Sequence, residues 1–270
     1  MPGYAIPAKL ACMTALNLAG TYRRTVGASL ARIRENVLDW EHLPALHSRS
    51  FARCELIDSD AEGWRIRLVN QPGDDSAAQI LKLRIAPDTS HYRVLTEAGP
   101  GARSEIRVTV TPYGPHETAV SVQYHVPETD PAQLDLIGRG FVAIYKQLWD
   151  EDEAMMQARE AALALRARTP APNRLDLGAI ADLQLPLAFD FGPGRFRLVD
   201  RGGTLMAHSM TCPHWLGPLD TPPGDDGCIT CPWHGYRFDV ATGRSADGRG
   251  LRLAPAPHVR IENGRVLACA

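Results

Sequence analysis

Residues 212–235 read CPHWLGPLDTPPGDDGCITCPWHG, and two short motifs within this stretch decide the fold of the C-terminal part of the chain. Cys212-Pro-His214 and Cys231-Pro-Trp-His234 each offer one thiolate and one imidazole. A two-iron cluster in which two cysteines bind one iron and two histidines bind the other needs this mixture. Structural zinc sites accept the same donors, but they usually pair cysteine with cysteine and histidine with histidine. The spacing therefore favours an iron–sulfur cluster over zinc and indicates electron transfer.

The residues that follow Cys231 resemble the second cluster loop of Rieske ferredoxins and ring-hydroxylating oxygenases. Respiratory Rieske proteins add a cysteine to each loop, whereas this chain has Gly217 and Trp233 near those places. The resemblance implies a small all-β Rieske domain, which we expect at residues 177–270. It also implies that a [2Fe-2S] cofactor is bound by Cys212, His214, Cys231 and His234.

Composition sets the size and class of the chain. At 270 residues, 44% of them apolar and 22% charged, it is long enough for two domains with separate cores. A net charge of −2 gives no reason to expect nucleic acid or an anionic membrane as a partner. Six cysteines, two of them assigned to the cluster, argue against a disulfide-linked secreted protein and favour the cytoplasm. The apolar run at 10–20 is too short to span a membrane.

A segment rich in proline and charge at 166–176 predicts a linker between two domains. Before it, β-rich runs separated by turn residues predict an antiparallel sheet. The expected strands lie at 51–57, 64–70, 79–86, 91–97, 105–111 and 119–126. Asp130-Pro131 then predicts the start of one long helix, in which Phe141, Ile144 and Leu148 recur with helical period. The fold class is therefore α+β, with a sheet-and-helix domain at 1–165.

A second set of possible metal ligands lies near the N-terminus, where the sequence reads Asn36-x2-Asp39-x2-His42-x4-His47. On an unbroken helix, two residues five apart point about 140° away from one another. Pro44 disfavours helical geometry at the preceding residue, so we expect the helix to end or bend between the histidines. Such an interruption would allow both imidazoles to reach one metal.

Two histidines leave a metal short of ligands, and non-haem iron sites that activate dioxygen add one carboxylate. Asp152 lies eleven residues after Phe141, which returns it to within about 20° of the apolar stripe of the long helix. A carboxylate on a buried face is costly unless it is paired or bound to metal. Asp152 is therefore the candidate third ligand. The competing interpretation is a solvated acidic turn.

Together these motifs resemble the mononuclear-iron motifs of Rieske non-haem iron oxygenases. The resemblance implies a mononuclear Fe(II) bound by His42, His47 and Asp152, and it implies that Asp39 connects this iron to a cluster histidine. The domain order is reversed, with the helix-grip catalytic domain first. Expected partners are O2, a small apolar organic substrate, and a ferredoxin or an NAD(P)H-dependent reductase. The reductase must be separate because the chain has no dinucleotide-binding fingerprint. The family resemblance also allows a homotrimer.

An alternative takes the N-terminal domain as an iron-free ligand-binding domain of the START or polyketide-cyclase type. His42 and His47 would then be ordinary cavity histidines, and Asp152 would lie at the surface. The chain would be a Rieske electron-transfer protein fused to a binding module. We favour the oxygenase, because two ligand sets occur beside a cluster suited to supply them with electrons, although fold alone does not fix function.

Overall fold

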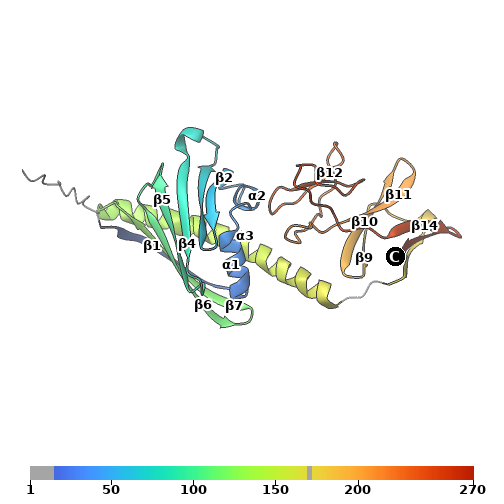
Figure 1. The fold of residues 1–270 in the computed structure, drawn as a ribbon, viewed down its shortest axis with the longest axis horizontal. Helices are drawn as coiled ribbons and strands as arrows, with labels where there is room; N and C mark the ends of the chain where they lie inside the picture. The colour runs from blue at the N-terminus through green and yellow to red at the C-terminus, as the bar shows by residue number, and fades with distance from the viewer. Residues whose placement is uncertain (1–14, 169–171) are drawn as a thin grey trace, which may run out of the picture.

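The computed structural model describes residues 15–168 and 172–270, and its N-terminal part is an antiparallel sheet with one long helix (Figure 1). The sheet has seven strands in the order β1-β7-β6-β5-β4-β3-β2. The strands are β1 (Asn17–Val26), β2 (Phe51–Asp60), β3 (Gly63–Asn70), β4 (Gln79–Ile85), β5 (His91–Ala98), β6 (Glu105–Gly114) and β7 (Glu117–Val126). The helices are α1 (Leu30–Leu38), α2 (Leu43–Leu46), the 3-10 turn η1 (Asp75–Ala77) and α3 (Pro131–Arg168). The predicted α+β class, the six strands and the long helix are confirmed.

The inner face of the sheet packs against α1 and α3 because apolar residues alternate along the strands. In β7 the side chains of Thr118, Val120 and Val122 are buried, and the residues between them are more exposed. Ile33 of α1 and Trp149 of α3 belong to the same core. Burial of these apolar faces is the main favourable term that holds the layers together.

Strand β1 was not predicted from the sequence. Its residues, NLAGTYRRTV, contain a glycine and two consecutive arginines that hide the alternation of a strand. It is held instead by register with β7, from Asn17 opposite Val126 to Val26 opposite Thr118. The apolar run expected at 10–20 therefore ends inside a strand, and its first residues lie outside the described part of the chain.

Helix α3 differs from the sequence prediction in two respects. Ile144, expected on the apolar stripe, is 52% exposed, whereas Trp149 is 4% exposed. The helix also continues to Arg168, inside the linker expected at 166–176, and the next strand begins at Arg174. Residues 169–171 lie outside the described residues, and α3 extends from the large sheet toward the C-terminal region (Figure 1).

A close approach of two glycines fixes α3 against the edge of the sheet. A Cβ at Gly138 would lie 2.0 Å from the Ala19 carbonyl oxygen, and a Cβ at Gly20 would lie 2.9 Å from the Gly138 Cα. Only glycine allows two backbones to come this close. This contact sets the depth at which α3, and the residues it carries further along, lie against the sheet.

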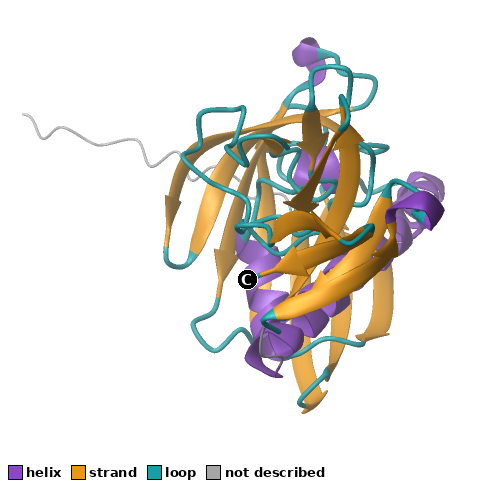
Figure 2. Cartoon of the chain, turned by 90° about the vertical axis from the view of Figure 1, so that its right-hand side faces the viewer, coloured by secondary structure: helices purple, strands orange, loops and turns teal. Residues whose placement is uncertain are grey.

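The C-terminal region consists of small sheets joined by loops (Figure 2). One sheet has the order β11-β10-β9, another pairs β12 with β13, and a third has the order β14-β15-β8. These strands are β8 (Arg174–Ala179), β9 (Leu187–Phe191), β10 (Gly194–Arg201), β11 (Thr204–Ser209), β12 (Cys228–Thr230), β13 (Arg237–Asp239), β14 (His258–Glu262) and β15 (Arg265–Cys269), and the 3-10 turn η2 spans Ile180–Asp182. Met155 of α3 packs in the core around Cys212 and Cys231. The long helix therefore contributes to both regions.

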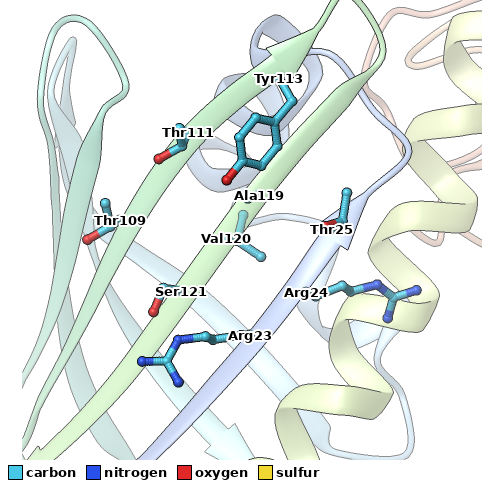
Figure 3. A pocket seen from close by; sticks show the side chains of 9 residues that line it. All are labelled: Arg23, Arg24, Thr25, Thr109, Thr111, Tyr113, Ala119, Val120 and Ser121. Atoms are coloured by element: carbon cyan, nitrogen blue, oxygen red, sulfur yellow. The ribbon is translucent and has the colours of Figure 1, made fainter.

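A shallow hollow lies on the solvent face of the large sheet, over β1, β6 and β7 (Figure 3). Its lining includes Arg23, Thr109, Thr111 and Ser121. Helix α3 covers the other face of this sheet, as the buried alternate residues of β7 show. The hollow is therefore separate from the histidines described next.

Candidate metal centres

The two cluster loops share one backbone geometry. In the first, the Cys212 carbonyl accepts a hydrogen bond from the Leu216 amide at 3.1 Å, and in the second the Cys231 carbonyl accepts from the Gly235 amide at 2.9 Å. The residue whose amide donates this hydrogen bond has a left-handed backbone conformation in both loops, with φ of 65° at Leu216 and 70° at Gly235. This conformation favours glycine, so Leu216 is strained. The two loops therefore have equivalent turns, one presenting Cys212 and His214 and the other Cys231 and His234.

The four ligand candidates have the burial and free atoms that a cluster requires. Cys212 and Cys231 are each 1% exposed, and the rings of His214 and His234 lie 4.5 Å apart. The Nδ1 atoms of both histidines are buried without a hydrogen-bond partner. A Cβ at Gly217 would lie 2.9 Å from the Cys231 sulfur. Two buried histidine nitrogens without partners thus lie beside two buried thiols, and Gly217 leaves no room for a side chain there. This arrangement fits a [2Fe-2S] cluster.

Protonation of these ligands follows their contacts. The hydrogen bond between the two thiols raises the pKa of Cys212 and lowers that of Cys231 to about 5, so one thiolate forms readily. Burial, followed by the charge of His234, lowers the pKa of His214 to about 4. His214 is therefore neutral at pH 7, the state in which imidazole binds a metal.

His42 and His47 lie at the two ends of the one-turn helix α2. Helix α1 ends at Leu38, His42 is the N-cap of α2, and His47 is its C-cap. Pro44 occupies the first turn of α2, where its missing N–H is not needed. The prediction that the helix is interrupted between the histidines is wrong: the break lies before both of them, between Leu38 and His42, and a complete turn of helix separates His42 from His47.

The structure brings His42, His47 and Asp152 together. Their side-chain ligand atoms lie within 4.8 Å of one another, and all three residues are buried. The Asp152 Oδ1 lies 3.4 Å from the His42 Nε2 and 3.1 Å from the His47 Nε2. Metal–ligand bonds of about 2.1 Å at right angles separate adjacent ligand atoms by about 3 Å. The donor set therefore fits a divalent metal held on one face.

Each of the three residues is oriented by one further polar group. The Asn36 side chain donates to the Asp152 Oδ1 at 2.9 Å. Glu151 lies 2.6 Å from the His47 Nδ1, and Asp39 lies 3.4 Å from the His42 Nδ1. In the sequence, Asn36 appeared only as part of the N-terminal motif, and neither Asn36 nor Glu151 was given a role. The one sequence signal for Glu151 was its position next to the candidate ligand Asp152.

The buried carboxylates of Asp39 and Asp152 need a positive charge beside them. Burial opposes a charged His42, but hydrogen bonds to Asp152 and Asp39 outweigh it and raise the pKa of His42 to about 10. Burial likewise opposes charge on the two carboxyl groups, yet their histidine partners hold the pKa of both Asp39 and Asp152 below the usual range. A proton on His42 balances the buried carboxylates, and a divalent metal would take the place of that proton.

Asp39 also contacts the cluster side of the molecule. Its Oδ2 accepts a hydrogen bond from the His234 Nε2 at 2.6 Å and lies 3.4 Å from the His42 Nδ1. The rings of His42 and His234 are 6.4 Å apart. The sequence motifs do not distinguish which of His214 and His234 faces Asp39, and the structure places His234 there. One carboxylate therefore joins a histidine of each candidate metal centre within a single chain.

Further polar contacts hold the two regions together. The Tyr236 hydroxyl donates to Glu41 at 2.5 Å, and Arg249 lies over the Tyr236 ring and donates to Glu41 at 3.0 Å. In addition, Arg159 of α3 lies 4.5 Å from the centre of the Trp215 ring and donates to the Trp215 carbonyl. Trp215 therefore contacts the chain's own helix.

Comparison with protein families matches residues 177–256 to the Rieske [2Fe-2S] domain. The C-terminal region is thus a Rieske domain, and a [2Fe-2S] cluster is the cofactor this implies. Apoptosis-inducing factor 3 of Mus musculus and of Homo sapiens is 35% identical over 77 residues, which is 28% of this chain. The match spans 13% of the length of those relatives.

Among solved structures, the ferredoxin of carbazole 1,9a-dioxygenase from Nocardioides aromaticivorans IC177 is 25% identical, with a TM-score of 0.31. It covers 36% of this chain and 98% of its own. A START superfamily protein from Mycobacterium smegmatis is 20% identical, with a TM-score of 0.40, over 50% of this chain and 97% of its own. None of the helices in the described residues has the length and apolar character needed to cross a membrane.

Proposed function

We propose that this chain is a Rieske-type oxygenase component. In it, Cys212, His214, Cys231 and His234 bind a [2Fe-2S] cluster, and His42, His47 and Asp152 bind a mononuclear Fe(II). The observation that carries the proposal is the single carboxylate of Asp39 between the two donor sets, 2.6 Å from His234 and 3.4 Å from His42. A surface contact between unrelated domains has no need of a buried carboxylate shared by two histidines.

When bound, the mononuclear iron would supply the activation of O2 that oxidises an apolar organic substrate. The residues of the chain would hold the two centres in place. Asp39 accepts a hydrogen bond from the His234 Nε2 and lies 3.4 Å from the His42 Nδ1, so it orients both rings. The contacts of Glu41 with Tyr236 and of Arg159 with Trp215 keep this geometry within one chain. Electrons would come from a separate ferredoxin or NAD(P)H-dependent reductase.

The second candidate function is that of a Rieske electron-transfer protein fused to an iron-free ligand-binding domain of the START type. One observation favours it: His42 already finds ionic partners in Asp152 and Asp39 without a metal. Metal content separates the two functions directly.

The test is an iron and sulfide count on anaerobically purified chain reconstituted with iron. We expect about three irons and about two acid-labile sulfides per chain for the oxygenase, and about two irons for the carrier. His42→Ala should lose one iron and keep the visible spectrum of the cluster. His91→Ala, on the exposed face of β5, is the matched control and should keep all three. A wild-type chain that never exceeds two irons would establish the carrier function instead.

A further inference from the structure

We propose that Glu151 is a positioning residue for the mononuclear metal, acting through His47. The inference rests on the metal site of the proposed function and assigns a role to a side chain that supplies no ligand atom in that site. It concerns how tightly a divalent transition metal is held by the two histidines and Asp152.

Consecutive carboxylates of α3 contact opposite nitrogens of the His47 ring. The Glu151 Oε2 lies 2.6 Å from the Nδ1, and the Asp152 Oδ1 lies 3.1 Å from the Nε2. His47 is 1% exposed, so water does not compete at either nitrogen. The ring is also packed edge-on against Phe51, with centroids 6.1 Å apart. His47 thus has one orientation, which Glu151 fixes from behind.

The short contact at the Nδ1 decides which nitrogen carries the proton. A carboxylate can only accept a hydrogen bond, so the His47 Nδ1 must donate its hydrogen to Glu151. The Nε2 of the neutral ring then has a free lone pair, and this atom faces Asp152 and the site. A carboxylate behind a ligating imidazole fixes its tautomer and makes it a stronger donor.

Glu151 is itself held in place by Gln147, whereas the neighbouring acid, Asp150, does not contact His47. Gln147, one turn earlier on α3, donates to the Glu151 Oε1 at 3.2 Å. Asp150 is 53% exposed and pairs with Arg24 of β1. Asp150 therefore offers a matched control, an acid one position away on the same helix that does not touch a histidine.

The experiment measures Co²⁺ affinity of the full chain with its cluster in place, by competition against a fluorescent chelator. Loss of a partner behind a ligating histidine typically weakens metal binding about 10–100-fold. We expect a loss of this size for Glu151→Ala. Glu151→Gln should lose less, because its amide oxygen still accepts from the ring. Asp150→Ala should bind Co²⁺ like the wild type, and His42→Ala defines the background.

If Glu151 only stabilised the fold, Glu151→Ala would also change the melting temperature or the visible circular dichroism of the cluster. We expect both to stay the same while Co²⁺ affinity falls. Affinity within twofold of the wild type, or an equal loss in Asp150→Ala, would overturn the inference and leave the metal site standing. A wild-type chain that binds no more Co²⁺ than His42→Ala would overturn both the inference and the proposed function.

Discussion

Replacing Asp39 with asparagine should raise the reduction potential of the Rieske cluster. The Asp39 carboxylate accepts the His234 Nε2 proton at 2.6 Å. A hydrogen bond to a charged group contributes about 1.5–3 kcal/mol and a neutral one about 0.5–1.5 kcal/mol, so the midpoints differ by about 1.2 kcal/mol. Negative charge beside a ligand stabilises the oxidised cluster, and its loss makes reduction easier. For one electron, about 59 mV corresponds to a tenfold change in equilibrium, so we expect the potential to rise by up to about 50 mV.

The assay is a redox titration of the cluster, followed by visible circular dichroism, in the wild type and in Asp39→Asn. The iron content should not change, because Asp39 is not among the candidate ligands. Asp58→Asn provides the control, since Asp58 is exposed on β2 and its ion pair with Arg65 is long, at 3.9 Å. A potential that stays the same or falls in Asp39→Asn would refute the contact between His234 and this carboxylate.

Two further predictions concern cluster loading at Gly217 and thiol reactivity at Cys54. Gly217→Ala places a methyl carbon 2.9 Å from the Cys231 sulfur, so we expect loss of cluster absorbance, whereas Gly140→Ala, which meets nothing within 4 Å, should load normally. Full cluster content in Gly217→Ala would contradict this packing. Burial and then the charge of Glu55 raise the pKa of the Cys54 thiol to about 12, so the thiol stays protonated at pH 8. Iodoacetamide should therefore modify Cys54 in the unfolded chain but hardly in the native one, and equal rates by mass spectrometry would argue against its burial.

Much of the Rieske domain could be predicted from the sequence because its information is local. Cys212 and His214 are two residues apart, so one turn presents both to the same space, and Cys231 and His234 repeat the arrangement. The strands of the large sheet were also visible, since alternation of buried and exposed residues is written along each strand. Strand β1 was missed because its residues depart from that pattern.

The contact of Asp39 with His234 could not be read from the sequence, because 195 residues separate them. Glu151 looked like one acid among four consecutive acids, and only the position of α3 against α2 shows that it faces His47. The sequence by itself determined which side chains can bind metal, since ligand chemistry and spacing belong to short segments. Tertiary structure alone decided that the two donor sets share one carboxylate, because helix length, sheet register and the Gly20–Gly138 contact set how distant segments meet.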